Sequence, residues 1–529
     1  MNLMTDKWIP VIRKDGTRDT IMPWQIVESE NPVMEINAPR PDFQGALYQF
    51  LIGLLQTYLA PEDENEWLEQ WKKTPSPETL QVAFGKVEEA FKLYNPDGAA
   101  FMQDYSLPEG EVKQIPALLL EAPGAKTIKD NLDHFIKRGE VACMCSACTA
   151  CTASALFSLQ INAPSGGQGH RVGLRGGGPL TTLIVSDKTN TCLWHKLWLN
   201  ILNQEEIANS SNPSDCAVLP WMGATRLSTQ KGTITTPETV HALHMYWGMP
   251  RRIRLNKPEE SGACDICGRR NVPVFNSYRT KNFGTNYEGA WVHPLTPYRM
   301  DPKKEKPPLS LKGQEGGLGY RHWLGLVLQE PELGDQSATV VRFFHEERRH
   351  LIGEGESGSL WCFGFDMDNM KARCWYDSRF PIFNLDKDQT KNLIDWAGEL
   401  IRSGREVVGM LRRAVKSAWF RRPEDAKGSM SMIDAQFWQA TETDFYRLLD
   451  KLALLPSETR MASPEIYDAW FKVLQQQVFY IFEHATMSAN PEDMDLKRIV
   501  LANKDLKKKF YGNKEIKSLR AKSIKEDEA

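Results

Sequence analysis

Two Cys-x-x-Cys pairs, Cys148/Cys151 and Cys264/Cys267, constrain the fold of this chain more than any other feature. The N-terminal residues show no secretion signal, so we expect the cysteines in a reducing compartment, free or metal-bound. Two such pairs can close one tetrahedral metal site. Because the segment between the pairs is much longer than in a zinc finger, a shared ion would join distant parts of the chain. We therefore predict one structural zinc ion bound by Cys148, Cys151, Cys264 and Cys267.

Two further cysteines leave alternatives open at the first pair. Cys143 and Cys145 lie just upstream and are interpreted as bystanders. However, Cys145, Cys148 and Cys151 also form Cys-x-x-Cys-x-x-Cys, which resembles part of an iron–sulfur ligand run. No further cysteine followed by proline completes that run, so zinc is favoured over a cluster. Core cysteines without a metal are the third alternative.

The composition indicates a large globular protein without a general nucleic-acid signature. The 529 residues are enough for two or three domains, and 41% hydrophobic residues with 16 tryptophans imply a large packed core. The net charge is only −3, so nucleic-acid binding would require a local basic patch. The longest apolar stretch, 46–59, is too short and too polar to span a bilayer. We therefore expect a soluble, cytoplasmic protein with no membrane partner.

The first part of the chain mixes strand and helix patterns. The apolar run 8–13, the turn residues Asp15 and Gly16 and a return strand near 20–22 predict a β-hairpin. The alternating segment 251–254 is typical of an edge strand. Hydrophobic periodicity further predicts helices at 43–59, 77–94 and 149–161, and strands at 180–185 and 338–344.

From about residue 386 the pattern becomes helical, with short polar connections that favour antiparallel neighbours. Four helices are predicted at 387–419, 431–455, 464–487 and 493–511. The predicted fold class is therefore α+β, with a mixed α/β domain over residues 1–385 and a four-helix bundle over 386–529. The basic tail, 504–525, is either a solvated or frayed helix face or a contact for phosphates or an acidic partner.

A glycine-rich stretch at 163–177 and a set of arginines are candidates for ligand contact. The glycines allow close backbone approach to a ligand, and His170, Arg171 and Arg175 supply donors. The spacing matches neither a phosphate-binding P-loop nor a dinucleotide fingerprint, and an ordinary surface loop is the alternative. Basic residues at 251–254 and 269–281 could form a phosphate-facing surface or a solvated face.

Catalytic motifs are missing from the sequence. No Gly-x-Ser-x-Gly or His-Glu-x-x-His segment is present, and nothing near Asp366 and Asp368 completes a metal site. We therefore interpret the protein as non-enzymatic. The alternative is a metal-dependent nuclease that uses the carboxylates near Asp366.

Several motifs in order resemble one family. They are the Trp-Ile-Pro-Val strand, the segment from Cys148 to Phe157, the glycine loop running into 173–177, the second cysteine pair with its glycine, and Gly289-Ala-Trp-Val-His-Pro294. This set resembles the CasA family, the large subunit of the type I-E CRISPR Cascade surveillance complex, over essentially the whole chain. The resemblance implies a non-catalytic protein with a mixed α/β domain and a C-terminal four-helix bundle.

The resemblance also implies a function and partners. The family recognises the protospacer-adjacent motif of double-stranded DNA through the minor groove and helps to open the duplex. It contacts the 5′ handle region of the CRISPR RNA, assembles with the other Cascade subunits and recruits the helicase–nuclease. The implied residues are Gly166, Gly167, Gln168, Gly169, Lys281 and Asn282 for motif recognition, Asn369, Met370 and Lys371 for the strand wedge, and Phe135 for the RNA handle.

Overall fold

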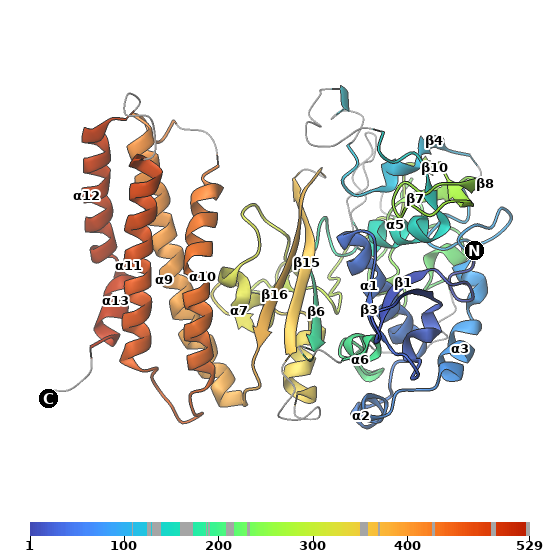
Figure 1. Ribbon diagram of the computed structural model, residues 1–529, viewed down its shortest axis with the longest axis horizontal. Helices are drawn as coiled ribbons and strands as arrows, with labels where there is room; N and C mark the ends of the chain where they lie inside the picture. The colour runs from blue at the N-terminus through green and yellow to red at the C-terminus, as the bar shows by residue number, and fades with distance from the viewer. Residues whose placement is uncertain are drawn as a thin grey trace. The chain divides into compact units, whose positions relative to one another are not determined.

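The computed structural model describes residues 1–107, 109–123, 128–129, 139–158, 173–186, 188, 191–207, 216–229, 233–349, 358–368, 371–425, 429–487 and 494–524 (Figure 1). They form two compact units. The first unit contains Met1–Gly313 and Gly334–Ile382, and the second contains Gln314–Leu333 and Phe383–Ala529. The predicted α+β class is confirmed, because small antiparallel sheets and helices make up the first unit and long helices the second.

The N-terminal hairpin is confirmed and begins the core of the first unit. Strand β1 (Ile9–Arg13) pairs antiparallel with β2 (Arg18–Ile21) and with β3 (Val33–Ile36). Gly16 in the β1–β2 turn has φ +84°, a conformation that glycine adopts without steric cost. The adjacent helix α1 (Pro41–Tyr58) is almost wholly buried, which explains why apolar residues occur on all of its sides.

Tryptophans hold the helices that follow α1. Trp67 of α2 (Glu64–Lys72) stacks on Trp198 of α6 (Leu193–Trp198), with ring centroids 6.5 Å apart. The predicted helix 77–94 is shorter than expected, because α3 (Pro77–Gly85) ends at a glycine and a 3-10 turn, η2 (Glu88–Phe91), follows. The predicted helix 149–161 corresponds to α5 (Ser146–Ser158), and its predicted last residues lie outside the described part.

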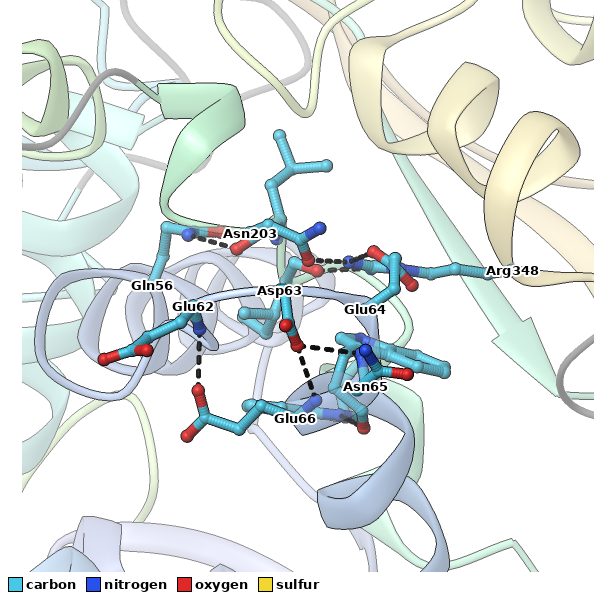
Figure 2. A network of polar contacts seen from close by, with 12 residues as sticks. Gln56, Glu62, Asp63, Glu64, Asn65, Glu66, Asn203 and Arg348 are labelled. Atoms are coloured by element: carbon cyan, nitrogen blue, oxygen red, sulfur yellow. Dashed lines mark hydrogen bonds and ion pairs between the residues drawn. The ribbon is translucent and has the colours of Figure 1, made fainter.

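A buried polar network connects α1 and α2 to the chain after α6 (Figure 2). Gln56 of α1 exchanges two hydrogen bonds of 2.8 Å with the backbone of Leu202. Arg348 donates to the Glu64 carboxylate at 3.1 Å, to Asn203 at 3.1 Å and to the carbonyl of Ile201. The network thus fixes the first turn of α2.

The central sheet has the order β16-β15-β6. Strand β15 (Gly358–Asp368) pairs with β16 (Lys371–Ile382) on one side and with β6 (Thr181–Ser186) on the other. The predicted strand 180–185 is confirmed. The predicted strand 338–344 is wrong, since these residues form α8 (Thr339–Phe343) and start the π-helical turn η8 (Phe344–Arg348). Tertiary packing overrides the β-propensity of the valines, because α8 packs against β6 and buries them.

Two further sheets carry the candidate sites. One has the order β4 (Glu111–Gln114), β10 (Ser277–Lys281) and β7 (Arg252–Leu255), which makes β7 the predicted edge strand. The other has the order β5 (Met144–Cys145), β9 (Val272–Phe275) and β8 (Glu259–Gly262). Short strands β11 (Tyr298–Arg299), β12 (Leu309–Ser310) and β14 (Asp335–Gln336) also pair.

The second unit contains the four predicted helices, α9 (Lys387–Trp419), α10 (Ser431–Ala453), α11 (Pro464–Met487) and α12 (Leu496–Gly512), and an additional helix, α13 (Lys514–Lys522). The segment 314–333, with α7 (Trp323–Val327) and β13 (Gln329–Glu330), also belongs to this unit. Tyr320 explains why: its ring stacks on Phe445 at 4.3 Å and its hydroxyl contacts Thr441 at 2.8 Å. From the sequence, residues 314–333 were expected in the first domain, because the predicted domain boundary lies at residue 386.

The basic tail packs on the bundle over its described residues. Lys507, Arg520 and Lys522 each lie over an aromatic ring of α11, at 5.3 to 5.8 Å from the ring centroid. Such cation–π contacts contribute about 0.5–1 kcal/mol each at exposed positions. Residues 504–524 are largely helical and most of their lysines are exposed, which agrees with the predicted alternative of a solvated helix face and not with a frayed one. Among the described helices, none is both long and apolar enough to cross a membrane.

Candidate metal centre and nucleic-acid interface

Four cysteines from two distant segments come together in the first unit. The sulfur atoms of Cys145, Cys148, Cys264 and Cys267 all lie within 4.8 Å of one another, and those of Cys145 and Cys267 are 3.6 Å apart. Tetrahedral zinc with Zn–S bonds of about 2.3 Å places neighbouring sulfurs about 3.8 Å apart. The donor set and its spacing therefore fit one structural zinc ion, as predicted.

The predicted ligand set needs one correction. Cys145, predicted as a bystander, belongs to the cluster, and Cys151, predicted as a ligand, does not. Cys145 ends β5 and Cys148 lies in the first turn of α5, so the change from strand to helix turns both sulfurs to one point. Cys151 is one turn further along α5, where burial raises the pKa of its thiol. It therefore packs as a small core residue.

The second cysteine pair lies in the connection between β8 and β9. Gly268 has φ +73°, and its N–H donates to the carbonyl of Cys264 at 2.9 Å. The N–H of Cys264 in turn donates to the carbonyl of Arg269 at 2.8 Å. Glycine adopts a positive φ without steric cost, so Gly268 permits this tight turn.

Asp265 fastens the two cysteine segments to each other next to the sulfur cluster. Its carboxylate accepts hydrogen bonds from the backbone N–H groups of Ala142 at 2.7 Å and Cys143 at 2.9 Å. Its own N–H donates to the carbonyl of Cys143 at 3.1 Å. Cys143 thus supports the cluster through its backbone, which agrees with its prediction as a non-ligand. Such outer contacts are a general property of metal sites, because they orient the ligands.

Hydrogen bonds among the four sulfurs shift the pKa values of the cysteines in opposite directions. Hydrogen bonding with Cys145, and next with Cys148, lowers the pKa of Cys267 to about 6. The same two partners lower the pKa of Cys264. Hydrogen bonding with Cys145 also raises the pKa of Cys148, so the opposite shifts reflect how closely the four thiols lie together.

A cleft lined by basic and acidic residues lies at β10, the strand that follows β9 in the sequence. Lys281 ends β10, Asn282 follows it, and both are exposed on a cleft of about 440 Å³ between β4, β7 and β10. Arg252 on β7 lines the cleft but is neutralised by the buried Asp104. Lys113 on β4 is 3.3 Å from Glu111. Lys281 makes no ion pair with any described residue, so its charge is available to a ligand.

Several residues of the predicted DNA- and RNA-contacting sites have no counterpart in the part of the chain that the structure describes. Gly166, Gly167, Gln168 and Gly169, as well as Phe135, Asn369 and Met370, lie outside the described residues, as does the side chain of Lys371. The backbones of Asp368 and Lys371 pair with each other at the end of the β15–β16 hairpin.

Asp366 gives no support to the nuclease alternative. Its side chain is buried, and its carboxylate accepts a hydrogen bond of 2.7 Å from Arg373. Among the residues that the structure describes, only the four cysteines gather three or more metal-ligating side chains. The carboxylate is thus engaged in an internal ion pair.

Arg175 has a role that its sequence context did not indicate. It was expected to be a donor to a ligand, but the side chain is only 2% exposed and donates inside the protein. Its acceptors are the side chains of Gln49 (2.6 Å), Thr181 (2.7 Å) and Thr296 (2.8 Å) and the carbonyl of Ser158 (2.7 Å). Arg175 thus fixes Ser158, the last described residue before the glycine-rich segment, to α1 and β6. No sequence signal separates such an arginine from an exposed one.

Comparison with known proteins identifies the class to which this chain belongs. Residues 2–481 match the model of the family described as CRISPR-associated protein Cse1. The crystal structure of CasA from Thermus thermophilus matches with a TM-score of 0.69 and 17% identity, covering 98% of this chain and 99% of that chain. Thermobifida fusca Cse1 matches with a TM-score of 0.68 and 16% identity, covering 99% of both chains.

A third similar structure is a chain of a CRISPR RNA-guided surveillance complex, with a TM-score of 0.63 and 15% identity over 96% of this chain and 99% of that one. At such low identity these structures establish the fold, whereas the family model spans nearly the whole chain. The protein is therefore a CRISPR-associated protein. It belongs to the Cse1 (CasA) family, the large subunit of the type I-E Cascade, and the predicted resemblance is confirmed.

Proposed function

We propose that this Cascade large subunit is a non-catalytic protein that recognises the protospacer-adjacent motif of double-stranded DNA through the minor groove. It then helps to open the duplex, contacts the 5′ handle region of the CRISPR RNA and recruits the helicase–nuclease. A chain of similar fold forms part of an RNA-guided surveillance complex, which supports assembly with RNA and other subunits.

The observation that carries the DNA proposal is the position of Lys281 and Asn282. Both are exposed at the end of β10, on the rim of a cleft, and Lys281 has no described ion-pair partner. A lysine can neutralise a phosphate, and a nearby amide can read groove edges. With the glycine loop 166–169, these two residues form the proposed motif reader. The proposed wedge is Asn369, Met370 and Lys371, and Phe135 is the proposed RNA-handle contact.

The zinc site has a structural part in this proposal. The connection with Cys264 and Cys267 lies between β8 and β9, and β10 follows β9 after a single residue. A zinc ion bound by Cys145, Cys148, Cys264 and Cys267 would hold this hairpin against β5 and α5. The ion supplies crosslinking and no reaction chemistry, because four protein ligands leave no open position.

The test is target binding by the assembled complex. Cascade reconstituted with Lys281→Ala should bind motif-bearing duplex more weakly, with a salt slope smaller by about one. The combined variant Gly167→Asp, Gln168→Ala and Lys281→Ala should lose motif-dependent binding. Lys472→Ala removes an exposed lysine of α11 and serves as the control. If the combined variant binds as tightly as the wild type, the assignment of the reader is wrong.

A further inference from the structure

A thiol and an imidazole meet outside the cysteine cluster and the proposed DNA-binding surface. Cys192 directly precedes α6, and its sulfur lies 3.0 Å from Nδ1 of His195. The other ring nitrogen of His195, Nε2, lies 3.0 Å from the carbonyl oxygen of Trp71. A carbonyl only accepts hydrogen bonds, so Nε2 carries a proton. Nδ1 therefore either accepts the proton of the thiol or, in the imidazolium, donates to the thiolate.

The imidazole of His195 lies at the C-terminal end of α2. Trp71 lies in the last turn of α2, where backbone carbonyls have no partner within the helix. The C-terminal end of a helix carries a partial negative charge, which attracts a cation or a hydrogen-bond donor. The neighbouring carbonyl of Gln70 accepts a hydrogen bond of 3.2 Å from the indole of Trp194. Side chains of α6 therefore cap the end of α2.

The surroundings of Cys192 favour its thiolate. Partial burial raises its pKa, but the hydrogen bond and the charge of His195 act in the opposite direction and outweigh burial, so that the pKa of Cys192 is lowered. Burial, and next the charge of Asp377, raises the pKa of Cys362 on β15. Because the thiolate is the nucleophilic form of cysteine, these two thiols should differ strongly in reactivity.

We propose that Cys192 and His195 form a reactive thiol site that is modified by small electrophiles and by hydrogen peroxide. The thiolate sulfur attacks one oxygen of the peroxide, so that an S–O bond forms and the O–O bond breaks. The leaving hydroxide takes the proton of the His195 imidazolium and becomes water. The sulfur is oxidised by two electrons to a sulfenic acid, and the peroxide is reduced.

Modification at Cys192 acts on one end of a helix whose other end is firmly held. The first turn of α2 is capped by Asp63, which accepts two hydrogen bonds of 2.9 Å, and is tied to Arg348 through Glu64 (Figure 2). An oxygen added to the Cys192 sulfur changes its 3.0 Å contact with His195, the residue whose other ring nitrogen contacts the carbonyl of Trp71.

The experiment compares alkylation rates of single cysteines in the full-length protein, using limiting iodoacetamide at neutral pH and mass spectrometry. Cys374 on β16 is exposed and serves as the internal reference. Cys192 should react about three to ten times faster than Cys374 in spite of its lower exposure, because a larger fraction is thiolate. After brief treatment with hydrogen peroxide, a sulfenic-acid trap should label Cys192 first.

Two variants separate the imidazole effect from a loosened helix. His195→Gln can still donate to the carbonyl of Trp71 but cannot form a cation, so it should reduce the rate at Cys192 to that of Cys374 or below. Trp194→Phe removes the adjacent cap and should leave the rate unchanged. Labelling of the buried Cys362 reports unfolding of either variant. A wild-type Cys192 that reacts more slowly than Cys374, or an equal loss in both variants, overturns the proposal.

Discussion

Exchanging single cysteines tests the corrected metal-ligand set directly. Cys145→Ser removes one sulfur of the four-sulfur cluster, whereas Cys151→Ser changes a neighbouring buried thiol on α5 that the cluster does not include. Structural zinc sites bind with about 10–16 kcal/mol at neutral pH, so the loss of one ligand in four removes about 2.5–4 kcal/mol. That is a large part of the 5–15 kcal/mol that typically stabilises a folded protein.

The control variant Cys151→Ser should lose less stability than Cys145→Ser, and for a different reason. In Cys151→Ser a hydroxyl replaces a buried thiol, which costs about 1–3 kcal/mol without a hydrogen bond. A serine in a helix can donate to the carbonyl four residues earlier, which reduces that cost. The zinc content of Cys151→Ser should stay at one ion per chain.

The assay is zinc content after purification, measured by elemental analysis, together with thermal unfolding with and without a chelator. Wild type and Cys151→Ser should contain one zinc and lose thermal stability when the chelator is added. Cys145→Ser should contain less zinc and respond weakly to the chelator. Retained zinc in Cys145→Ser combined with lost zinc in Cys151→Ser would refute the geometric assignment and restore the ligand set predicted from the sequence.

Two further predictions concern stability. Arg348→Met should destabilise the first unit by about 3–5 kcal/mol, since it leaves Glu64 and the carbonyl of Ile201 without their buried partner. The free energy of unfolding in urea measures this loss, and a loss below about 1 kcal/mol contradicts the prediction. Burial lowers the pKa of His244 from 6.5 to about 4. The unfolded chain therefore takes up a proton first, and stability present above pH 6.5 falls by about 3 kcal/mol as the pH drops to 4. His244→Gln should flatten this part of the pH profile of the unfolding free energy, and an unchanged profile argues against His244 as its source.

The long helices of the second unit could be predicted from the local sequence pattern. Helices α9 and α11 have the bounds that hydrophobic periodicity predicted, because the repeat of apolar residues is long and begins at residues such as Asp386 that cap a helix. The short elements were harder to predict. Residues 338–344 carry β-branched residues yet form a helix, since burial against β6 outweighs a propensity of at most about 1 kcal/mol.

For the candidate site, too, some features could be predicted from the sequence and others depended on the tertiary structure. The sequence by itself determined that two cysteine segments could share one metal ion, that a family resemblance spans the chain, and that a bundle ends it. Only the tertiary structure decided that Cys145 and not Cys151 joins the cluster, because both are separated from Cys148 by two residues and only the strand-to-helix bend selects between them. It also decided that Arg175 is buried and that Cys192 meets His195 at the end of α2, since these contacts depend on segments that are distant in the chain. Spacing specifies which residues can act together, and packing specifies which of them do.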